Sequence, residues 1–452
     1  MKKRKTSIVI LTYNNFNYTK DCIESIKKYT KKNSYEIIVV DNLSTDGTRD
    51  WLKKQKDLKV ILNDENMGFP KGCNQGIEVA DPNNDILLLN NDTIVTTNWL
   101  ENLKICLYSN DLVGVVGSVS NHQENLQGVD FTYNDFEEMQ KLAKKNNISD
   151  SNRWEEKVFL IGFCILIKRD VLNKIGLLDE EYSPGYVEDN DLSLRIIDAG
   201  YKLMLCHDSF IHHYLGTAFR KDLNKFYPIL YRNRNYFESK WGFNTFQFDK
   251  IKHASLRILK DDKEKPLRFL DVNCGIGATM LKIKNDYRNA EIDGIESNEN
   301  MAKFAKHFGT IFKNYNELTE QDYDYIIIGN LLEKIDRPEI FLQDIKKHLK
   351  KDGFIIGEIS NISSHKIILE LLKDNWYFNN NFPRNNKNHF TIEDINTLFL
   401  NNGYKHTSTF NWFSILNKEE ENLLEQLNNI IGQNKIYSYK THYYSFQFQK
   451  NN

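Results

Sequence analysis

Acidic side chains crowd the stretch GYVEDNDLSLR, where Glu188, Asp189 and Asp191 lie close together. Arg195 comes four residues after Asp191, so on a helix that begins here the two would pair on one face. Glu188 and Asp189 would then remain at the helix start, free to face a cleft. Neighbouring like charges raise a carboxyl pKa, which favours a proton acceptor that works near neutral pH. The alternative is a solvated helix N-terminus, where acidic residues are also favoured.

A second set of polar residues follows short apolar runs that are predicted to be strands. The run ILLL leads into Asn-Asn-Asp at 90–92, and the run EIIVV leads into Asp41 and Asn42. The first run ends in TYNN at 12–15. Ligands of open parallel sheets bind at the carboxyl ends of the strands. Each of these ends alone could be a turn or a helix cap, but together they predict one polar rim.

Glycine and histidine add to this rim. Gly68 and Gly72 follow the third run and would let the backbone approach a ligand closely. His212 and His213 form a pair downstream of the acidic strand end, which makes them candidate metal ligands.

The elements that must position these residues alternate between strand and helix. In the first 245 residues we predict strands at 7–12, 36–41, 58–62, 86–90, 158–167 and 203–207. Continuous apolar strands separated by helices predict a parallel sheet covered on both faces. After a charged connector, a second alternation has predicted strands at 267–272, 291–296, 324–330, 353–360 and 443–449. The expected fold is α/β with two domains in series, 1–245 and 267–452, joined by a linker at 246–266.

Composition narrows the classes of function. The chain has 452 residues, with 60 Lys+Arg against 62 Asp+Glu, so nothing favours nucleic acid as a partner. The six cysteines form no CxxC pair, which fits reduced thiols in a cytosol better than disulfides or a zinc site. No apolar stretch approaches the ~18–20 residues of a membrane helix. We therefore expect a cytoplasmic protein with at most peripheral contact to the inner face of a membrane.

The first alternation resembles a known family. The segments that carry the likeness are SIVILTYNN, VVDNLSTDGT, NMGFPKGCNQGI, LLLNNDT, GFCILIKRDVLNKIGLLDEEY, EDNDLSLR and IHHYLGT. In order and in kind they resemble inverting family 2 glycosyltransferases of the GT-A type, over nearly all of residues 5–242. The resemblance implies a nucleotide-diphosphate sugar donor, of the UDP or dTDP type, and a glycan, lipid-linked or protein acceptor.

The same resemblance implies roles for individual residues. Asp189 would be the general base, with Glu188 beside it. Asp92 would be a ligand of Mg²⁺ or Mn²⁺, together with His212 or its neighbour His213. The residues implied in nucleotide-sugar binding are Thr12, Asn14, Asp41, Asn42, Asn66, Gly68, Gly72, Asn74 and Asn91. One departure is that the metal motif here holds a single carboxylate, so metal affinity is expected to be low until substrate phosphate completes the shell.

The second alternation begins with LDVNCGIGA, where Gly275 and Gly277 allow a tight turn under a ligand. Glu296 ends the next strand, where an acid can bind a ribose diol. A dinucleotide-binding fold is the weaker interpretation, because Met280 stands where a third glycine is expected. The loop, GIESNENMAKFA and the 323–361 stretch resemble class I S-adenosylmethionine-dependent methyltransferases over 267–450.

That resemblance implies that Asp271, Asn273, Gly275 and Gly277 surround the methionine part of S-adenosylmethionine, and that Glu296 holds the ribose. Asn273 replaces the first glycine of the loop, and Lys334 stands where related sequences often have histidine.

The expected function is therefore a bifunctional enzyme of glycan assembly whose first domain transfers a sugar and whose second domain methylates a sugar. One alternative is a glycosyltransferase whose second domain binds or acts as a scaffold without catalysis. The other is a glycan-binding or assembly protein without activity.

Overall fold

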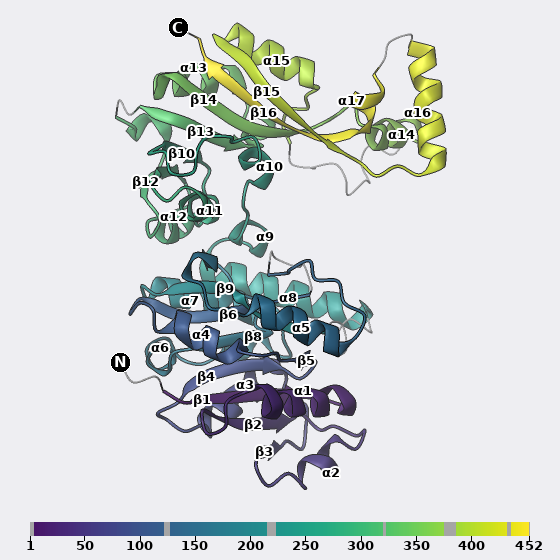
Figure 1. The fold of residues 1–452 in the computed structure, drawn as a ribbon. Coiled ribbons are helices and arrows are strands. Elements are labelled where there is room, and N and C mark those ends of the chain that lie inside the picture. The colour runs from purple at the N-terminus through teal and green to yellow at the C-terminus, as the bar shows by residue number, and fades with distance from the viewer. Residues whose placement is uncertain are drawn as a thin grey trace. The chain divides into compact units, whose positions relative to one another are not determined.

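The computed structural model describes residues 4–121, 127–214, 223–319, 322–374, 386–431 and 435–451. The chain divides into two compact units, Met1–Asp249 and Lys250–Asn452, and each is described by itself (Figure 1). The stretch 246–266, predicted to be a linker, contains the end of the short helix α9 (Thr245–Phe248) and all of α10 (His253–Leu256). The domain limits predicted from the sequence stay a prediction.

The first unit is a mixed sheet with helices on both faces. Its strands are β1 (Thr6–Thr12), β2 (Tyr35–Asp41), β3 (Lys59–Leu62), β4 (Asp85–Asn90), β5 (Thr93–Ile94), β6 (Val113–Ser120), β7 (Trp154–Lys157), β8 (Cys164–Ile167) and β9 (Lys202–His213). Its helices are α1 (Phe16–Tyr29), α2 (Thr48–Leu52), α3 (Phe69–Glu78), α4 (Trp99–Leu107), α5 (Phe136–Asn146), α6 (Arg169–Ile175), α7 (Glu188–Asp198), α8 (Leu223–Trp241) and α9.

The strand order is β3-β2-β1-β4-β8-β6-β9-β5, with β7 also paired to β9. Strands β1 to β4 are parallel, as predicted, but β8 runs antiparallel to both β4 and β6. The prediction of an all-parallel sheet was therefore wrong at β8, and residues 158–163 lie outside that strand. The reason is that CILI is buried throughout, and a short, fully apolar run carries no information about strand direction.

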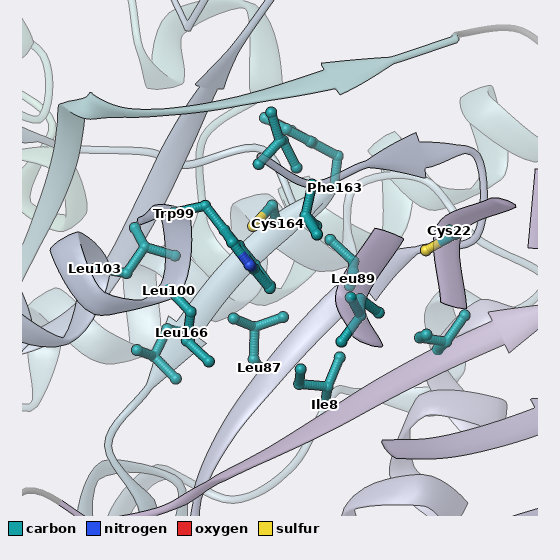
Figure 2. Close-up of a cluster of buried hydrophobic side chains, with 14 of the residues drawn as sticks. Ile8, Cys22, Leu87, Leu89, Trp99, Leu100, Leu103, Phe163, Cys164 and Leu166 are labelled. Carbon is teal, nitrogen blue, oxygen red and sulfur yellow. The ribbon is translucent and has the colours of Figure 1, made fainter. Parts of the chain in front are cut away.

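Successive side chains of β1 point to opposite faces of the sheet, and both faces are covered by helices. Ile8 and Ile10 join the core that α1 and α4 cover. Val9, on the opposite side, packs so closely under α3 that a Cβ on Gly76 would lie 2.4 Å from it. Figure 2 shows the first of these cores, where the fully buried Trp99 of α4 lies among apolar residues of β4 and β8. This packing fixes the carboxyl end of β4, where the Asn-Asn-Asp motif begins.

The second unit is also an α/β layer structure. Its strands are β10 (Arg268–Val272), β11 (Glu291–Ile295), β12 (Thr310–Phe312), β13 (Tyr323–Gly329), β14 (Leu349–Ser360), β15 (Tyr404–Phe413) and β16 (Thr441–Lys450). Its helices are α10, α11 (Ala278–Asp286), α12 (Glu299–Ala305), α13 (Pro338–Lys346), α14 (His365–Leu372), α15 (Ile392–Asn401), α16 (Lys418–Ile431) and α17 (Ile436–Lys440).

The strand order is β12-β11-β10-β13-β14-β16-β15. The first five strands are parallel, and β16 runs antiparallel to β14 and β15. The direction of the connections reverses at β10, which has β11 on one side and β13 on the other. Such a reversal opens a crevice at the carboxyl ends of the strands. In neither unit does a helix of the described residues have the length and hydropathy to cross a membrane.

Candidate active sites

The strand end that carries Asp92 is held against the end of β9. After β4 the chain enters β5, which pairs antiparallel with β9 so that Thr93 lies opposite His213. This register brings His213 Nε2 to 3.1 Å from Asp92 Oδ1, and both side chains are nearly buried. The His213 ring also stacks on Phe163, with centroids 5.1 Å apart. A carboxylate and an imidazole therefore share one corner of the sheet edge.

His212 points away from this pair because successive side chains of a strand alternate. Its Nδ1 lies 2.6 Å from the Tyr133 hydroxyl, and its Nε2 is buried without a hydrogen-bond partner. Burial, and then the neighbouring His213, lower the pKa of His212 to about 4, so its ring is neutral at pH 7. The structure thus brings His213 onto Asp92, whereas it places His212 in an aromatic cluster.

Thr12 and Asn91, both predicted to line the nucleotide pocket, hold neighbouring strand ends together. The Asn91 amide donates to Thr12 Oγ1 at 3.3 Å and to Thr19 Oγ1 at 2.9 Å. The backbone N–H of Asn42 donates to the Thr12 carbonyl at 2.8 Å, and its side-chain amide donates to the Gly68 carbonyl at 3.1 Å. The ends of β1, β2 and β4 are therefore linked by hydrogen bonds on one rim.

Asp41 is fully buried at the end of β2. Its Oδ2 accepts hydrogen bonds from Ser44 N at 3.1 Å and from Arg49 Nη1 at 3.2 Å. Its Oδ1 is buried and has no hydrogen-bond partner. A buried acceptor without a partner is costly unless a ligand donor reaches it. Sequence reasoning missed Arg49, although it lies in the same stretch as the predicted Asp41.

The other residues predicted on this rim shape the loops. Asn14 Oδ1 accepts from Thr45 N at 2.8 Å, and Asn66 Oδ1 accepts from Gly68 N at 3.0 Å. Asn74 donates to the Leu178 carbonyl at 2.9 Å and to Glu180 at 3.0 Å.

Gly68 and Gly72 pack closely against other parts of the protein. A Cβ on Gly72 would lie 2.3 Å from Leu11 Cδ1, and one on Gly68 would lie 2.7 Å from Pro184 Cα. Direct contact of Gly68, Gly72 and Asn74 with a nucleotide stays a prediction.

Glu188 and Asp189 begin helix α7, as the sequence predicted. Asp189 Oδ1 accepts from Asn190 N at 2.9 Å and Oδ2 from Gly162 N at 3.3 Å, which orients the carboxylate. Burial raises the pKa of Asp189 to about 6. Burial and the charge of Asp189 raise the pKa of Glu188 to about 8. Near neutral pH the pair therefore retains a proton, which Glu188 holds more readily than Asp189 does.

Gly162 and Phe163 join this carboxylate to the Asp92 corner. The backbone N–H of Gly162 donates to Asp189. The backbone carbonyl of the next residue, Phe163, accepts from Asn90 N at 2.9 Å, and the Phe163 ring stacks on His213. The Asp189 carboxylate and the Asp92–His213 pair are therefore both contacted by the two-residue segment Gly162–Phe163.

Asp191 has a separate, structural role. Its Oδ2 pairs with Arg195 Nε at 2.8 Å, which confirms the predicted pair on one helix face. Its Oδ1 is bound by Lys240 at 2.7 Å and Trp241 Nε1 at 3.0 Å.

Replacing Glu188 by glutamine is expected to raise thermal stability, and to do so more at pH 9 than at pH 5. Glu188 Oε2 is buried without a hydrogen-bond partner. Because its pKa in the folded state is raised from 4.5 to about 8, the unfolded chain loses this proton first, and stability falls as pH rises between these values. Thermal unfolding of wild type and E188Q across pH measures the difference. The exposed Glu181→Gln should show no such pH trend; an equal gain of E188Q at both pH values would contradict the assignment.

In the second unit, the loop after β10 is tightly turned. Asn273, Gly275 and Gly277 all have positive φ, and a Cβ on Gly277 would lie 2.6 Å from Phe308. Glu296, at the end of β11, is buried, and its Oε2 accepts from Gly275 N at 2.8 Å. The loop and the acid are therefore fixed to each other, and ribose binding by Glu296 stays a prediction.

Asp271 lies fully buried at the end of β10, and burial raises its pKa. Its Oδ1 pairs with the Lys252 ammonium, whereas its Oδ2 is buried without a hydrogen-bond partner. Sequence reasoning missed Lys252, which lies in the stretch interpreted as a linker. A buried acid with an unfilled acceptor beside a glycine loop fits the cationic, ribose-bearing S-adenosylmethionine.

Comparisons with known proteins agree with this division. Residues 7–176 match the family model for glycosyl transferase family 2, and residues 243–409 match the model for a methyltransferase domain. The glycosyltransferase GlyG of Streptococcus pneumoniae is 28% identical over 37% of this chain and 58% of its own length. The glycosyltransferase AglE of Haloferax volcanii is 27% identical over 45% of this chain and 64% of its own.

A methyltransferase is also among the similar proteins. The (S)-tetrahydroprotoberberine N-methyltransferase of Eschscholzia californica is 22% identical over 25% of this chain and 36% of its own length. The chain thus spans less than two thirds of each of these relatives. The predicted class of two α/β domains in series is confirmed. The chain carries a family 2 glycosyltransferase domain followed by a methyltransferase domain.

Proposed function

We propose that the first domain transfers a sugar from a nucleotide-diphosphate donor with inversion, and that Asp189 accepts the proton of the acceptor hydroxyl. The observation that carries this proposal is the Gly162–Phe163 segment, which ties an ionised, partly buried carboxylate to the Asp92–His213 corner. Direct displacement needs a base on one side of the reacting sugar and a site for the leaving diphosphate on the other side.

The donor set at the corner fits a divalent cation. Asp92 offers a carboxylate oxygen and His213 an imidazole nitrogen, which suit Mn²⁺ or Mg²⁺. No group of three or more His, Cys, Asp or Glu side chains with metal-site geometry occurs among the described residues, so diphosphate oxygens would have to complete the shell. The bound cation would supply charge neutralisation for the leaving group. We propose Asp92 and His213 as its protein ligands, in place of His212.

The donor and acceptor are proposed at the level of class. Asp41, with its unpartnered Oδ1, is suited to a base or ribose donor of a nucleotide of the UDP or dTDP type. The acceptor would be a glycan, lipid-linked or protein hydroxyl. A reducing cytoplasmic compartment, with at most peripheral membrane contact, is in keeping with six buried, unpaired cysteines.

For the second domain we propose S-adenosylmethionine-dependent methylation of a sugar. Supporting features are the glycine loop, the buried Asp271 and the Gly275–Glu296 hydrogen bond. The rival is a domain that binds without catalysis, which Lys334 favours because it stands where related sequences often carry a histidine.

A labelling experiment separates these two roles. With tritiated methyl on S-adenosylmethionine, wild type should transfer label into a glycan fraction that depends on prior sugar transfer. Glu296→Gln should weaken cofactor binding by roughly tenfold or more, because a charged acceptor of the ribose is lost. Cofactor binding without any label transfer would support the binding-only role, and no binding at all would remove the cofactor from the proposal.

A further inference from the structure

The ammonium group of Lys252 lies against the end of β10 and the loop that follows it in the second unit. Its Nζ donates to Asp271 Oδ1, to the Val272 carbonyl at 2.6 Å and to the Asn273 carbonyl at 3.2 Å. An ammonium has three N–H donors, so all three are used by these acceptors. The side chain is only 12% exposed.

The stem and backbone of Lys252 are also accommodated by the fold. A Cβ on Gly329 would lie only 3.1 Å from Cδ and Cε of Lys252. The glycine that ends β13 therefore leaves space for the lysine side chain. The backbone N–H of Lys252 donates to Thr279 Oγ1 of α11 at 3.1 Å. The lysine thus lies across the carboxyl ends of β10 and β13, where the strand order reverses and ligands of such sheets bind.

One carboxylate oxygen and two carbonyls form a cage for an ammonium group. The amino-acid part of S-adenosylmethionine carries an α-ammonium with the same three donors, and the family resemblance places that part at this loop. Two cations cannot share the cage, because their repulsion at contact distance is strong in a buried site.

We propose that Lys252 holds the ammonium cage in the cofactor-free protein and that the cofactor's α-ammonium displaces it on binding. This inference rests on the proposed cofactor of the second domain. Lys252 then acts as an internal competitor that lowers cofactor affinity. The charge of Lys252 also opposes the effect of burial, which raises the pKa of the Asp271 carboxyl.

The test compares two ligands on variants of two lysines. S-adenosylhomocysteine carries the α-ammonium, whereas 5′-methylthioadenosine shares the nucleoside and sulfur but lacks the amino-acid part. In Lys252→Met, calorimetry should show S-adenosylhomocysteine binding tightened by about tenfold or more, with 5′-methylthioadenosine unchanged. Lys350→Met, which breaks another lysine–aspartate pair of the unit, with Asp324 at 2.8 Å, should change neither affinity. Lys252→Gln repeats the test should the methionine variant fold poorly.

Several results would overturn the inference. Unchanged or weaker S-adenosylhomocysteine binding in both Lys252 variants would show that the lysine does not compete for the cage. Equal tightening of both ligands would indicate relief of crowding rather than loss of a competing cation. If neither ligand binds wild type or the variants, the proposed cofactor fails as well, whereas binding to wild type without a gain in the variants refutes the competition alone.

Discussion

Asp189→Asn is expected to reduce the rate of sugar transfer by about 10²–10⁴-fold, the usual contribution of a positioned base. The amide keeps the size of the side chain and can still accept from Gly162 N, but it cannot take a proton. Since the pKa of Asp189 is raised to about 6, the wild-type rate should fall as pH drops below that value. The measurement is release of nucleoside diphosphate from the donor, with acceptor present, across pH.

A matched control lies on the same helix. Asp198→Asn, at the exposed carboxyl end of α7, should leave both the rate and the pH profile unchanged. Donor binding of D189N should also resemble wild type. Its stability near neutral pH should not fall, because the substitution removes a buried carboxylate whose ionisation opposes folding. A variant D189N that transfers sugar at the wild-type rate would show that another group is the base.

Asp92→Ala and His213→Ala are each expected to weaken Mn²⁺ binding to the nucleoside-diphosphate complex by about a hundredfold or more. Each removes one of the two protein donors that lie 3.1 Å apart. Asn90→Ala and His212→Ala should cost less than about tenfold, because an amide oxygen is a weaker ligand and His212 points to Tyr133. Free Mn²⁺, measured by electron paramagnetic resonance during titration with UDP, dTDP or GDP, reports these affinities.

This comparison also tests the choice between the two histidines. Equal losses in the His212 and His213 variants would contradict the assignment of His213 as the ligand. Equal losses in the Asp92 and Asn90 variants would show that the motif does not rely on a single carboxylate.

The sequence was informative wherever chemistry lies in a local pattern. Polar residues at strand ends, the helix start at Glu188 and the Asp191–Arg195 pair all follow from spacing along one element. The direction of strand β8 could not be predicted from the sequence, because its short, fully buried apolar run is compatible with a parallel or an antiparallel neighbour. Strand β15 was missed because its residues are mostly polar and only one of them is buried, so they give no regular alternation of apolar and polar side chains.

Contacts between distant segments could not be predicted. His213 reaches Asp92 only through the register of the two-residue strand β5 on β9. Lys252 reaches Asp271 because a stretch without clear periodicity folds back over the end of β10. Gly72 was interpreted as making room for a ligand, whereas the nearest atom to a Cβ there belongs to Leu11. Such cases depend on tertiary packing that a single sequence does not encode locally.

The central claim is that one chain carries two separate ligand sites, and thermal unfolding of the full chain tests it most directly. Wild type should be stabilised by a nucleoside diphosphate with Mn²⁺ and, independently, by S-adenosylhomocysteine, since ligands that bind the native state raise its melting temperature. Asp92→Ala should lose only the first shift and Glu296→Gln only the second. Absence of both shifts in wild type, or loss of both in either variant, would contradict the account.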